Sequence, residues 1–229
     1  MTSKKKCLII EAHSDDSAIS CFGFLNKFKK SYEYHFVLIA ASDTTPSYSS
    51  NVITKEQRLS EYQQYVDYLD GVWHKDSFIP GDFDSKLDTI PKSSLVKFIE
   101  KIITQVKPNL LICQGPSFHH DHTIVYETTI AALRPNGSQL PEQILIMENP
   151  TFIHSSEIIK DLKPNFYCTL KENEIIQKIE LFKKFFHSQI RGSASYISPE
   201  SLLSWAKYRG LEARKDFAEA FYSYKTVLS

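Results

Sequence analysis

Two short clusters of histidine and carboxylate residues each follow an apolar run that is typical of a buried strand. His13, Asp15 and Asp16 come just after the run at residues 7–10, and a His-His-Asp-His cluster at residues 119–122 comes shortly after the run at residues 109–113. In open α/β sheets, catalytic and binding sites collect beyond the carboxyl ends of the strands. If these two strands are neighbours, their clusters meet, and imidazole and carboxylate groups together predict a metal site.

A hydrolytic zinc site usually takes three protein ligands from His, Asp and Glu and leaves one position open to water. His13, Asp16 and His122 would supply such a set. Asp15 lies one residue from a ligand, so it is the natural candidate for the base that takes a proton from the attacking water. We therefore expect hydrolytic chemistry at this point of the chain.

The second cluster contains further candidates. His119 can face the same cavity and either stabilise an oxyanion or protonate a leaving amine. Asp121 is expected to hydrogen-bond to a histidine ring nitrogen and so set its tautomer, whereas His120 is expected to point elsewhere. An alternative explanation is that Asp15 or Ser14 merely caps a helix that begins near residue 17. Three histidines within four residues, placed after a second buried strand, favour the metal site.

The elements that must position these clusters alternate between strand and helix, which is typical of βαβ units. Strands are predicted near residues 6–11, 35–41, 72–79, 109–113, 143–147 and 166–170, and helices near residues 17–30, 55–70, 92–106, 122–133 and 171–187. A last helix begins with a capping Ser198, and Gly210 is expected to break or end it. The apolar residues of the tail at 218–222 fit both the helical and the strand period, so this segment is predicted as either a helix or a late strand. The fold class is thus α/β, a Rossmann-like and mostly parallel sheet flanked by helices, with a parallel pattern that weakens after the strand at residues 166–170.

Composition restricts the partners and the compartment. The chain has 229 residues, with 27 Lys plus Arg and 27 Asp plus Glu, so its overall charge gives no reason to expect nucleic acid or an anionic membrane. The first apolar stretch ends at Glu11, too short to span a bilayer, and we expect a cytoplasmic protein without membrane insertion. Four isolated cysteines (Cys7, Cys21, Cys113 and Cys168) predict neither disulfides nor a thiolate site. We expect one domain over residues 1–229; the pattern sets no oligomeric state.

The segment from Ala12 to Asp16 resembles the A-H-P-D-D-E signature of the LmbE-like, or PIG-L, zinc-dependent N-acetylglucosaminyl de-N-acetylases. The segment from His119 to His122 resembles the H-P-D-H motif of the same family. The resemblance implies a hydrolase that removes an N-acetyl group from an amino sugar on a small molecule, such as a nucleotide sugar or a glycoside, with release of acetate and a free amine.

Carried over position by position, the resemblance makes His13, Asp16 and His122 the zinc ligands, Asp15 the general base and His119 the electrostatic or acid partner. These roles agree with those argued from the residue types. Two histidines and one aspartate also accept other divalent ions, such as iron.

The family's R-x-x-E motif is similar to the segment from Arg58 to Glu61, where the resemblance implies that Arg58 reaches substrate hydroxyls or phosphate. A surface salt bridge is the alternative explanation for Arg58. Fainter similarities lie at residues 81–84, 187–189, 209–210 and 218–221, and no chemical role follows for Glu219.

The chain departs from the family at three places. Ser14 stands where the family has Pro, Ser17 stands where it has Glu, and residues 42–44 replace its T-x-G. Because neither Ser14 nor Ser17 is a predicted ligand, metal binding should survive. Two alternatives therefore stay open, a zinc amidase that acts on a non-sugar amide and a catalytically weak sugar-binding protein.

Overall fold

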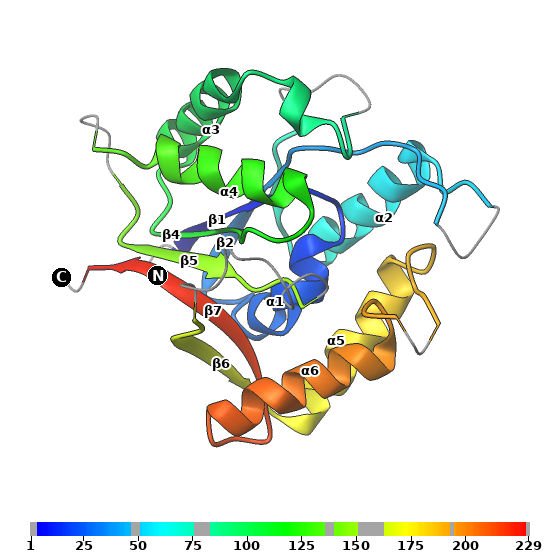
Figure 1. Cartoon of the computed structure of the whole chain (residues 1–229). Coiled ribbons are helices and arrows are strands. Elements are labelled where there is room, and N and C mark those ends of the chain that lie inside the picture. The colour runs from blue at the N-terminus through cyan, green and yellow to red at the C-terminus, as the bar shows by residue number, and fades with distance from the viewer. Residues whose placement is uncertain are drawn as a thin grey trace.

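The computed structural model describes residues 4–46, 51–75, 83–135, 140–150, 163–192 and 195–227. Within these ranges the chain alternates strands and helices, as Figure 1 shows by colour. The elements are, in chain order, β1 (Lys5–Glu11), α1 (Asp16–Lys27), β2 (Tyr32–Leu38), α2 (Lys55–Tyr68), β3 (Val72–Trp73), a 3₁₀ turn (Leu87–Thr89), α3 (Lys92–Val106), β4 (Leu110–Gln114), α4 (His120–Ala132), β5 (Gln143–Met147), β6 (Phe166–Leu170), α5 (Glu172–Phe185), α6 (Pro199–Glu212) and β7 (Phe217–Thr226).

The strands form one seven-stranded sheet in the order β3-β2-β1-β4-β5-β7-β6. The first five strands in this order are parallel, whereas β7 runs antiparallel to both β5 and β6. The predicted Rossmann-like α/β class is thereby confirmed, and the parallel pattern weakens after residue 170 as predicted, because β7 is antiparallel to both of its neighbours. The strand β1 lies directly beside β4, with Ile10 paired to Cys113, so the two ligand clusters follow neighbouring strand ends.

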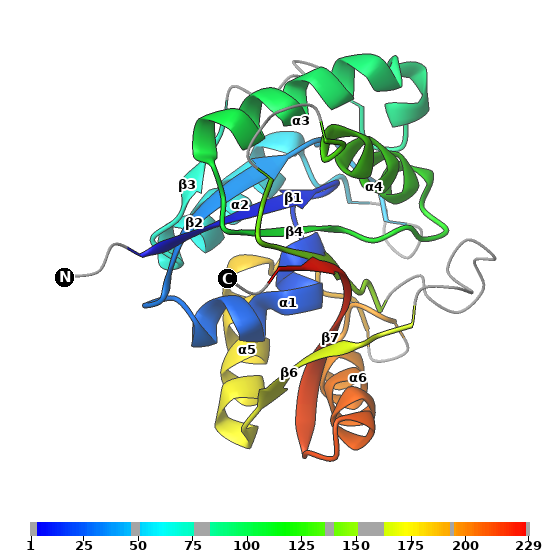
Figure 2. The same cartoon turned by 90° about the vertical axis from the view of Figure 1, so that its left-hand side faces the viewer.

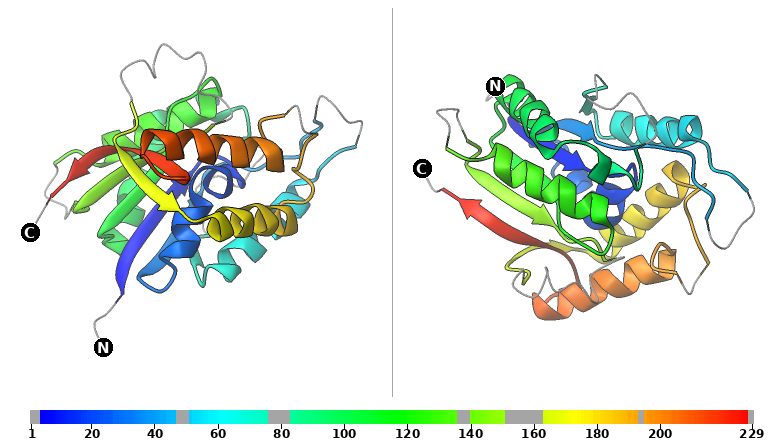
Figure 3. Two further views of the ribbon diagram at one scale, coloured as in Figure 1. Left: turned by 90° about the horizontal axis from the view of Figure 1, so that it is seen from below. Right: turned by 45° about the horizontal axis from the view of Figure 1, so that its top comes forward.

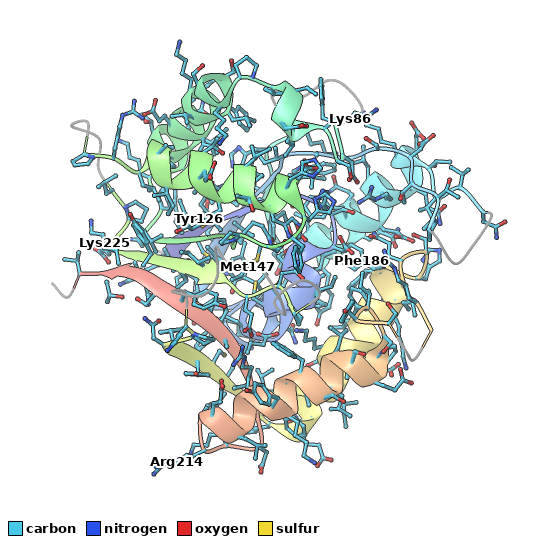
Figure 4. The ribbon with its side chains drawn as sticks, viewed as in Figure 1. Lys86, Tyr126, Met147, Phe186, Arg214 and Lys225 are labelled. Atoms are coloured by element: carbon cyan, nitrogen blue, oxygen red, sulfur yellow. The ribbon has the colours of Figure 1, made fainter. Side chains whose placement is uncertain are left out.

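Helices cover both faces of the sheet, because successive strand residues point to opposite sides. In Figures 1 and 2, α3 and α4 lie on one face, and α1, α5 and α6 lie on the other. Figure 3 shows α5 beside α6, and α5 also packs against α1 and α2. Each face has its own buried cluster of apolar side chains; Met147 and Phe186, labelled in Figure 4, belong to the cluster under α1 and α5.

Three local predictions need correction. Gly210 neither breaks nor ends the last helix, because α6 continues through it to Glu212. The strand predicted at 72–79 is short, with β3 at Val72–Trp73, and residues 76–79 lie outside the described ranges. The second strand begins at Tyr32 rather than near residue 35. The ambiguous tail is a strand, β7, since its pairing with both neighbours decides between the two periods.

Helix α2 buries an unusual set of residues. The side chains of Arg58, Glu61 and Tyr65 are buried, with exposed fractions of 5%, 1% and 0%, alongside the apolar side chains of the same helix. Tyr65 packs edge-on against Phe22 of α1 at a ring-centroid distance of 4.9 Å. The polar side chains of Arg58 and Glu61 therefore point into the molecule, beside the ends of the strands. Within the described part of the chain, no helix has both the length and the apolar character that crossing a bilayer requires.

Candidate metal centre and active site

The first ligand cluster lies in the turn that joins β1 to α1. The backbone N–H of Asp16 donates to the carbonyl of His13 at 3.3 Å, and the backbone N–H of His13 donates to Asp16 Oδ2 at 2.8 Å. The turn is therefore closed from both sides, which holds both side chains at the end of β1. His122 comes from the first turn of α4, just beyond the end of β4.

Three side chains bring potential ligand atoms together there. His13 Nδ1 lies 3.1 Å from His122 Nε2 and 3.6 Å from Asp16 Oδ2, and His122 Nε2 lies 3.2 Å from Asp16 Oδ1. A tetrahedral ion with bonds of about 2.0–2.1 Å requires ligand atoms roughly 3.3 Å apart. The donor types of His13, Asp16 and His122 and their separations are therefore compatible with a divalent metal ion.

The far ring nitrogen of each histidine faces an oxygen. His13 Nε2 lies 3.2 Å from Asp121 Oδ2, and His122 Nδ1 lies 2.7 Å from Ser117 Oγ. Asp121 is held in turn by the backbone N–H groups of Ser85 and Leu87, at 2.6 and 3.1 Å. If each far nitrogen carries the proton, the lone pairs of His13 Nδ1 and His122 Nε2 point to the same place. Asp121 thus contacts the ring of His13.

The electrostatics of the cluster also favour a cation. Burial alone would lower the pKa of His13, but its contacts with the carboxylates of Asp121 and Asp84 raise that pKa to about 10. Burial alone would raise the pKa of Asp16, but His122 and His13 lower it to about 2. Buried carboxylates that surround one imidazole thus stabilise positive charge at its position, which is what a divalent ion supplies.

Asp15 and His119 line the adjoining cavity, which has a volume of about 180 Å³. Asp15 is the N-cap residue of α1, yet its side chain makes no capping hydrogen bond. The explanation that Asp15 serves as a helix cap is therefore wrong. Burial and the neighbouring Asp16 raise the pKa of Asp15, which suits a proton acceptor.

The ring of His119 stands edge-on to that of His13 at a centroid distance of 4.5 Å, and it lies 5.1 Å from the ring of His122. Burial and these two histidines lower the pKa of His119 to about 4. His120, by contrast, is exposed, as predicted.

Arg58 also lines the cavity, but it is buried, so a surface salt bridge is not its explanation. Its Nη1 donates to the carboxylate of Asp84 and, at 3.0 Å, to the carbonyl oxygen of Ser42. The Ser42 hydroxyl accepts the backbone N–H of Asp84 at 3.1 Å. Ser42 thus ties Arg58 and Asp84 together in the region where the family's T-x-G is replaced.

The sequence reasoning missed Asp84, Asn149 and Gln189 as site residues, although all three line the cavity. Asp84 Oδ1 lies 3.4 Å from His13 Nε2. Among the described residues, two groups bring potential donor atoms within 4.8 Å of one another: one comprises His13, His119 and His122, and the other comprises His13, Asp84, His119 and Asp121. Asp84 stands in the faint similarity at 81–84, where residues 81 and 82 lie outside the described ranges.

Asn149 donates from Nδ2 to Asp16 Oδ1 at 3.2 Å. A polar pair, Glu148 and Asn149, directly after the β5 run was the available signal for this residue.

The two serines that replace family residues also have partners. The Ser14 hydroxyl lies 3.4 Å from Gln189 Nε2, which also lies 3.4 Å from Glu61 Oε2. Ser17 Oγ lies 3.0 Å from the hydroxyl of Tyr65. The hydroxyl of Ser14 thus links the metal-binding turn to the segment after α5, a contact that a proline cannot make.

Comparisons with solved structures show the fold. The 4-carboxy-2-hydroxymuconate hydratase GalB from Pseudomonas putida matches with a TM-score of 0.72 and 14% identity, over 98% of each chain. The N,N'-diacetylchitobiose deacetylase from Pyrococcus horikoshii matches with a TM-score of 0.68 and 19% identity, over 96% of this chain and 83% of that one. The conserved protein TT1542 from Thermus thermophilus matches with a TM-score of 0.69 and 20% identity, over 98% and 97%. One fold therefore carries different chemistries, and function must be argued from the site.

Sequence comparison gives two further matches. Coatomer subunits beta-1 and beta-2 from Arabidopsis thaliana are each 29% identical over 112 residues, which are 46% of this chain and 12% of the coatomer subunit. The chain thus spans only a small part of these relatives. The family model of the GlcNAc-PI de-N-acetylases, PIG-L, matches residues 8–133, which include both ligand clusters and more than half of the chain. The chain therefore belongs to the PIG-L family.

Proposed function

We propose that this protein is a metal-dependent hydrolase that removes an N-acetyl group from an amino sugar carried on a small molecule, such as a nucleotide sugar or a glycoside. The main observation in support is the convergence of His13 Nδ1, His122 Nε2 and the Asp16 carboxylate, with Asp15 and His119 at the same cavity. Family membership supports the same chemistry, since the matching family is one of de-N-acetylases. We also propose that the protein acts in the cytoplasm as a single domain over residues 1–229.

His13, Asp16 and His122 would hold the ion, which we propose to be zinc, although iron is also compatible with this donor set. When bound, such an ion polarises the amide carbonyl and makes water more acidic. Every other contribution comes from the side chains around it.

Asp15 acts as the base. It accepts a proton from the water whose oxygen attacks the acetamide carbonyl carbon, and a tetrahedral oxyanion forms. Its raised pKa brings it closer to neutrality, where it can both accept and return a proton. When the C–N bond breaks, the proton passes to the nitrogen, and acetate and a free amine leave.

His119 serves the opposite face of the reacting carbonyl. Because its pKa is lowered to about 4, it is neutral at pH 7 and carries one ring N–H. That N–H can donate to the developing oxyanion or to the departing nitrogen. Its ring packing against His13 and His122 keeps it beside the proposed ligands.

Arg58 is proposed to bind the sugar. Its positive charge is matched by Asp84, whose side chain is 14% exposed, while Arg58 itself is buried. A compensated ion pair suits neutral hydroxyl groups, which can accept from the guanidinium and donate to the carboxylate, better than it suits a free anion. Arg58 and Asp84 together therefore favour a sugar ring over a phosphate at this position.

The test is to purify the protein, measure its metal content and assay acetate release from a panel of N-acetylated amino sugars, nucleotide sugars and glycosides. The matched arm uses acylated amines that lack a sugar ring. Metal at one equivalent with acetate only from the sugars supports the proposal. Activity restricted to the non-sugar amides would instead identify an amidase, and sugar binding without acetate release would identify a binding protein.

A further inference from the structure

Glu11, the last residue of β1, is an acidic residue with no exposed surface, and its side chain is hydrogen-bonded to Ser17 and Tyr62. Its Oε2 accepts the backbone N–H of Ser17 at 2.9 Å, and its Oε1 accepts the hydroxyl of Tyr62 from α2. None of the roles assigned above uses Glu11. Burying a carboxylate costs free energy unless it is hydrogen-bonded. The complete burial of Glu11, with a hydrogen bond at each oxygen, therefore calls for a structural explanation.

The reason lies at the beginning of α1. The first N–H groups of a helix have no partner within the helix, and an Asp at the N-cap normally accepts one of them, from the second or third helical residue. Here Asp15 is the N-cap and Ser17 is the second helical residue, yet the Asp15 side chain makes no capping bond. The N–H of Ser17 goes to Glu11 instead.

The other acidic side chain of this turn is also occupied. Asp16 accepts the backbone N–H of His13 and lies beside His122. Asp15 thus makes no capping bond to the N–H of Ser17, and it lines the cavity beside Asp16.

We propose that Glu11 is a positioning residue that caps α1 from outside the helix and thereby keeps the carboxylate of Asp15 directed at the cavity. Without an acceptor at residue 11, the Asp15 carboxylate, which occupies the N-cap position, would accept the N–H of Ser17 and turn away from the cavity. This inference rests on the proposed base role of Asp15.

The inference also explains how the chain tolerates Ser17 where the family signature has Glu. The Ser17 side chain is short and ends at the hydroxyl of Tyr65. The carboxylate beside this turn therefore comes from β1 rather than from α1. Its second contact, to Tyr62, ties it to α2, so the cap is fixed by three elements.

The test compares two variants of the full chain. Glu11→Leu removes the acceptor with little change of volume, whereas Glu11→Gln retains an acceptor oxygen for the N–H of Ser17. Tyr62→Phe is the matched control, because it removes the other contact of Glu11 and leaves the cap. Each variant is measured for kcat, KM, zinc affinity and thermal unfolding, and the Glu11→Leu structure is solved by crystallography. Glu11→Ala takes the place of Glu11→Leu if the latter does not fold.

In Glu11→Leu we expect kcat to fall about tenfold or more, as for partial loss of a general base. KM and zinc affinity should stay within about threefold of wild type, because the ligands and Arg58 are untouched. The crystal structure should show the Asp15 carboxylate bonded to the N–H of Ser17 or Ala18. Glu11→Gln and Tyr62→Phe should keep most of the activity.

Two results would overturn the inference. One is an Asp15 carboxylate that stays in place in the Glu11→Leu crystal structure. The other is a parallel fall of kcat, zinc affinity and melting temperature, which indicates a general structural role. If the wild type releases no acetate from any substrate, the proposed function fails, and the crystallographic comparison still decides the position of Asp15.

Discussion

At the scale of single residues, the proposed centre depends on the partner of each functional side chain as much as on its identity. Asp16 can serve as a ligand because Asn149 and the backbone of His13 orient its carboxylate. Asp15 can serve as a base because it is not engaged as a helix cap. Neighbouring carboxylates therefore have separate roles, set by what each one contacts.

Replacing the proposed base should separate metal binding from chemistry. Asp15→Asn should keep one equivalent of zinc and lose acetate release by about 10²–10⁴-fold, because it removes the proton acceptor and leaves the ligands. His13→Ala should lose the zinc itself. Metal analysis and an acetate assay check both, with the exposed Asp67→Asn as the control. Full activity in Asp15→Asn would disprove the base assignment.

The partner of the second histidine ligand should tune metal affinity. Ser117→Ala removes the oxygen 2.7 Å from His122 Nδ1, which frees the ring to rotate and to change tautomer. We expect zinc affinity to fall roughly tenfold or more. Competition with a chelator measures it, and Ser93→Ala, on the exposed side of α3, should have no effect. An unchanged affinity would show that Ser117 does not orient the ligand.

At the scale of elements, α1 is two helical pieces joined at a kink. Cys21 lies in the middle with non-helical dihedral angles of −141° and 19°. The N–H groups of Gly23 and Phe24, which follow the kink, donate to the carboxylate of Glu219 on β7 at 2.8 and 2.6 Å. Glu219 thus has a structural role, since it caps the second piece of the helix.

The Glu219 carboxylate is also paired with the buried Lys178 of α5 at 2.7 Å. Glu219→Ala leaves the buried Lys178 with the carbonyl of Ile19 but without its counter-charge, and it removes the carboxylate that accepts the N–H groups of Gly23 and Phe24. We therefore expect a loss of about 3–5 kcal/mol in unfolding free energy. The exposed pair of Lys183 and Glu180 is the control, and Glu180→Ala should cost at most about 1 kcal/mol. Urea unfolding measures both, and equal losses would contradict the proposed cap.

Gly210 serves the close approach of α6 to the chain that enters β7. A Cβ atom at this position would lie 2.5 Å from the carbonyl oxygen of Asp216 and 2.7 Å from Cα of Phe217. Gly210→Ala should therefore destabilise the fold by about 1–3 kcal/mol through overpacking. Gly192→Ala is the control, since a Cβ there meets no described atom within 4 Å. Thermal melting compares the Gly210→Ala and Gly192→Ala variants, and equal melting temperatures would contradict the proposed overpacking at Gly210.

At the scale of the whole molecule, one sheet separates two buried apolar clusters and joins the two halves of the chain. The last strand, β7, inserts between β5 and β6, so the end of the chain completes the same sheet. Such an arrangement predicts a single cooperative unit.

The two tryptophans allow that prediction to be tested. Trp73 lies on the edge strand β3, and Trp205 lies on α6, where its Nε1 donates to Glu148 at 2.9 Å. Trp73→Phe and Trp205→Phe each leave one reporter at a different end of the sheet. In each variant, the melting temperature from tryptophan fluorescence should equal the one from circular dichroism. Added zinc should raise this melting temperature, because it binds the folded state. Two separate transitions would contradict the single domain.

The alternation of strand and helix was predictable from the sequence, because hydrophobic period and caps are local properties. The two clusters of His and Asp residues were predictable in the same way, because each follows an apolar run in the sequence. The sequence did not predict that α6 passes through Gly210, because the constraint there is contact with Asp216 rather than helix propensity. Nor did it predict Asp84, since one carboxylate in a loop carries no local signal for the histidine that it will face.

The sequence by itself therefore determined the α/β class, the family and the residues able to bind a metal, all of which depend on neighbouring residues in the chain. Only the tertiary structure decided which of them meet. The pairing of β1 with β4 brings His13 to His122 across 109 positions, and β5 brings Asn149 to Asp16 across 133. Such contacts are set by strand order and by the packing of helices on the sheet. Only the folded chain therefore shows that the Asp15 side chain makes no capping bond and that Glu11 accepts the N–H of Ser17.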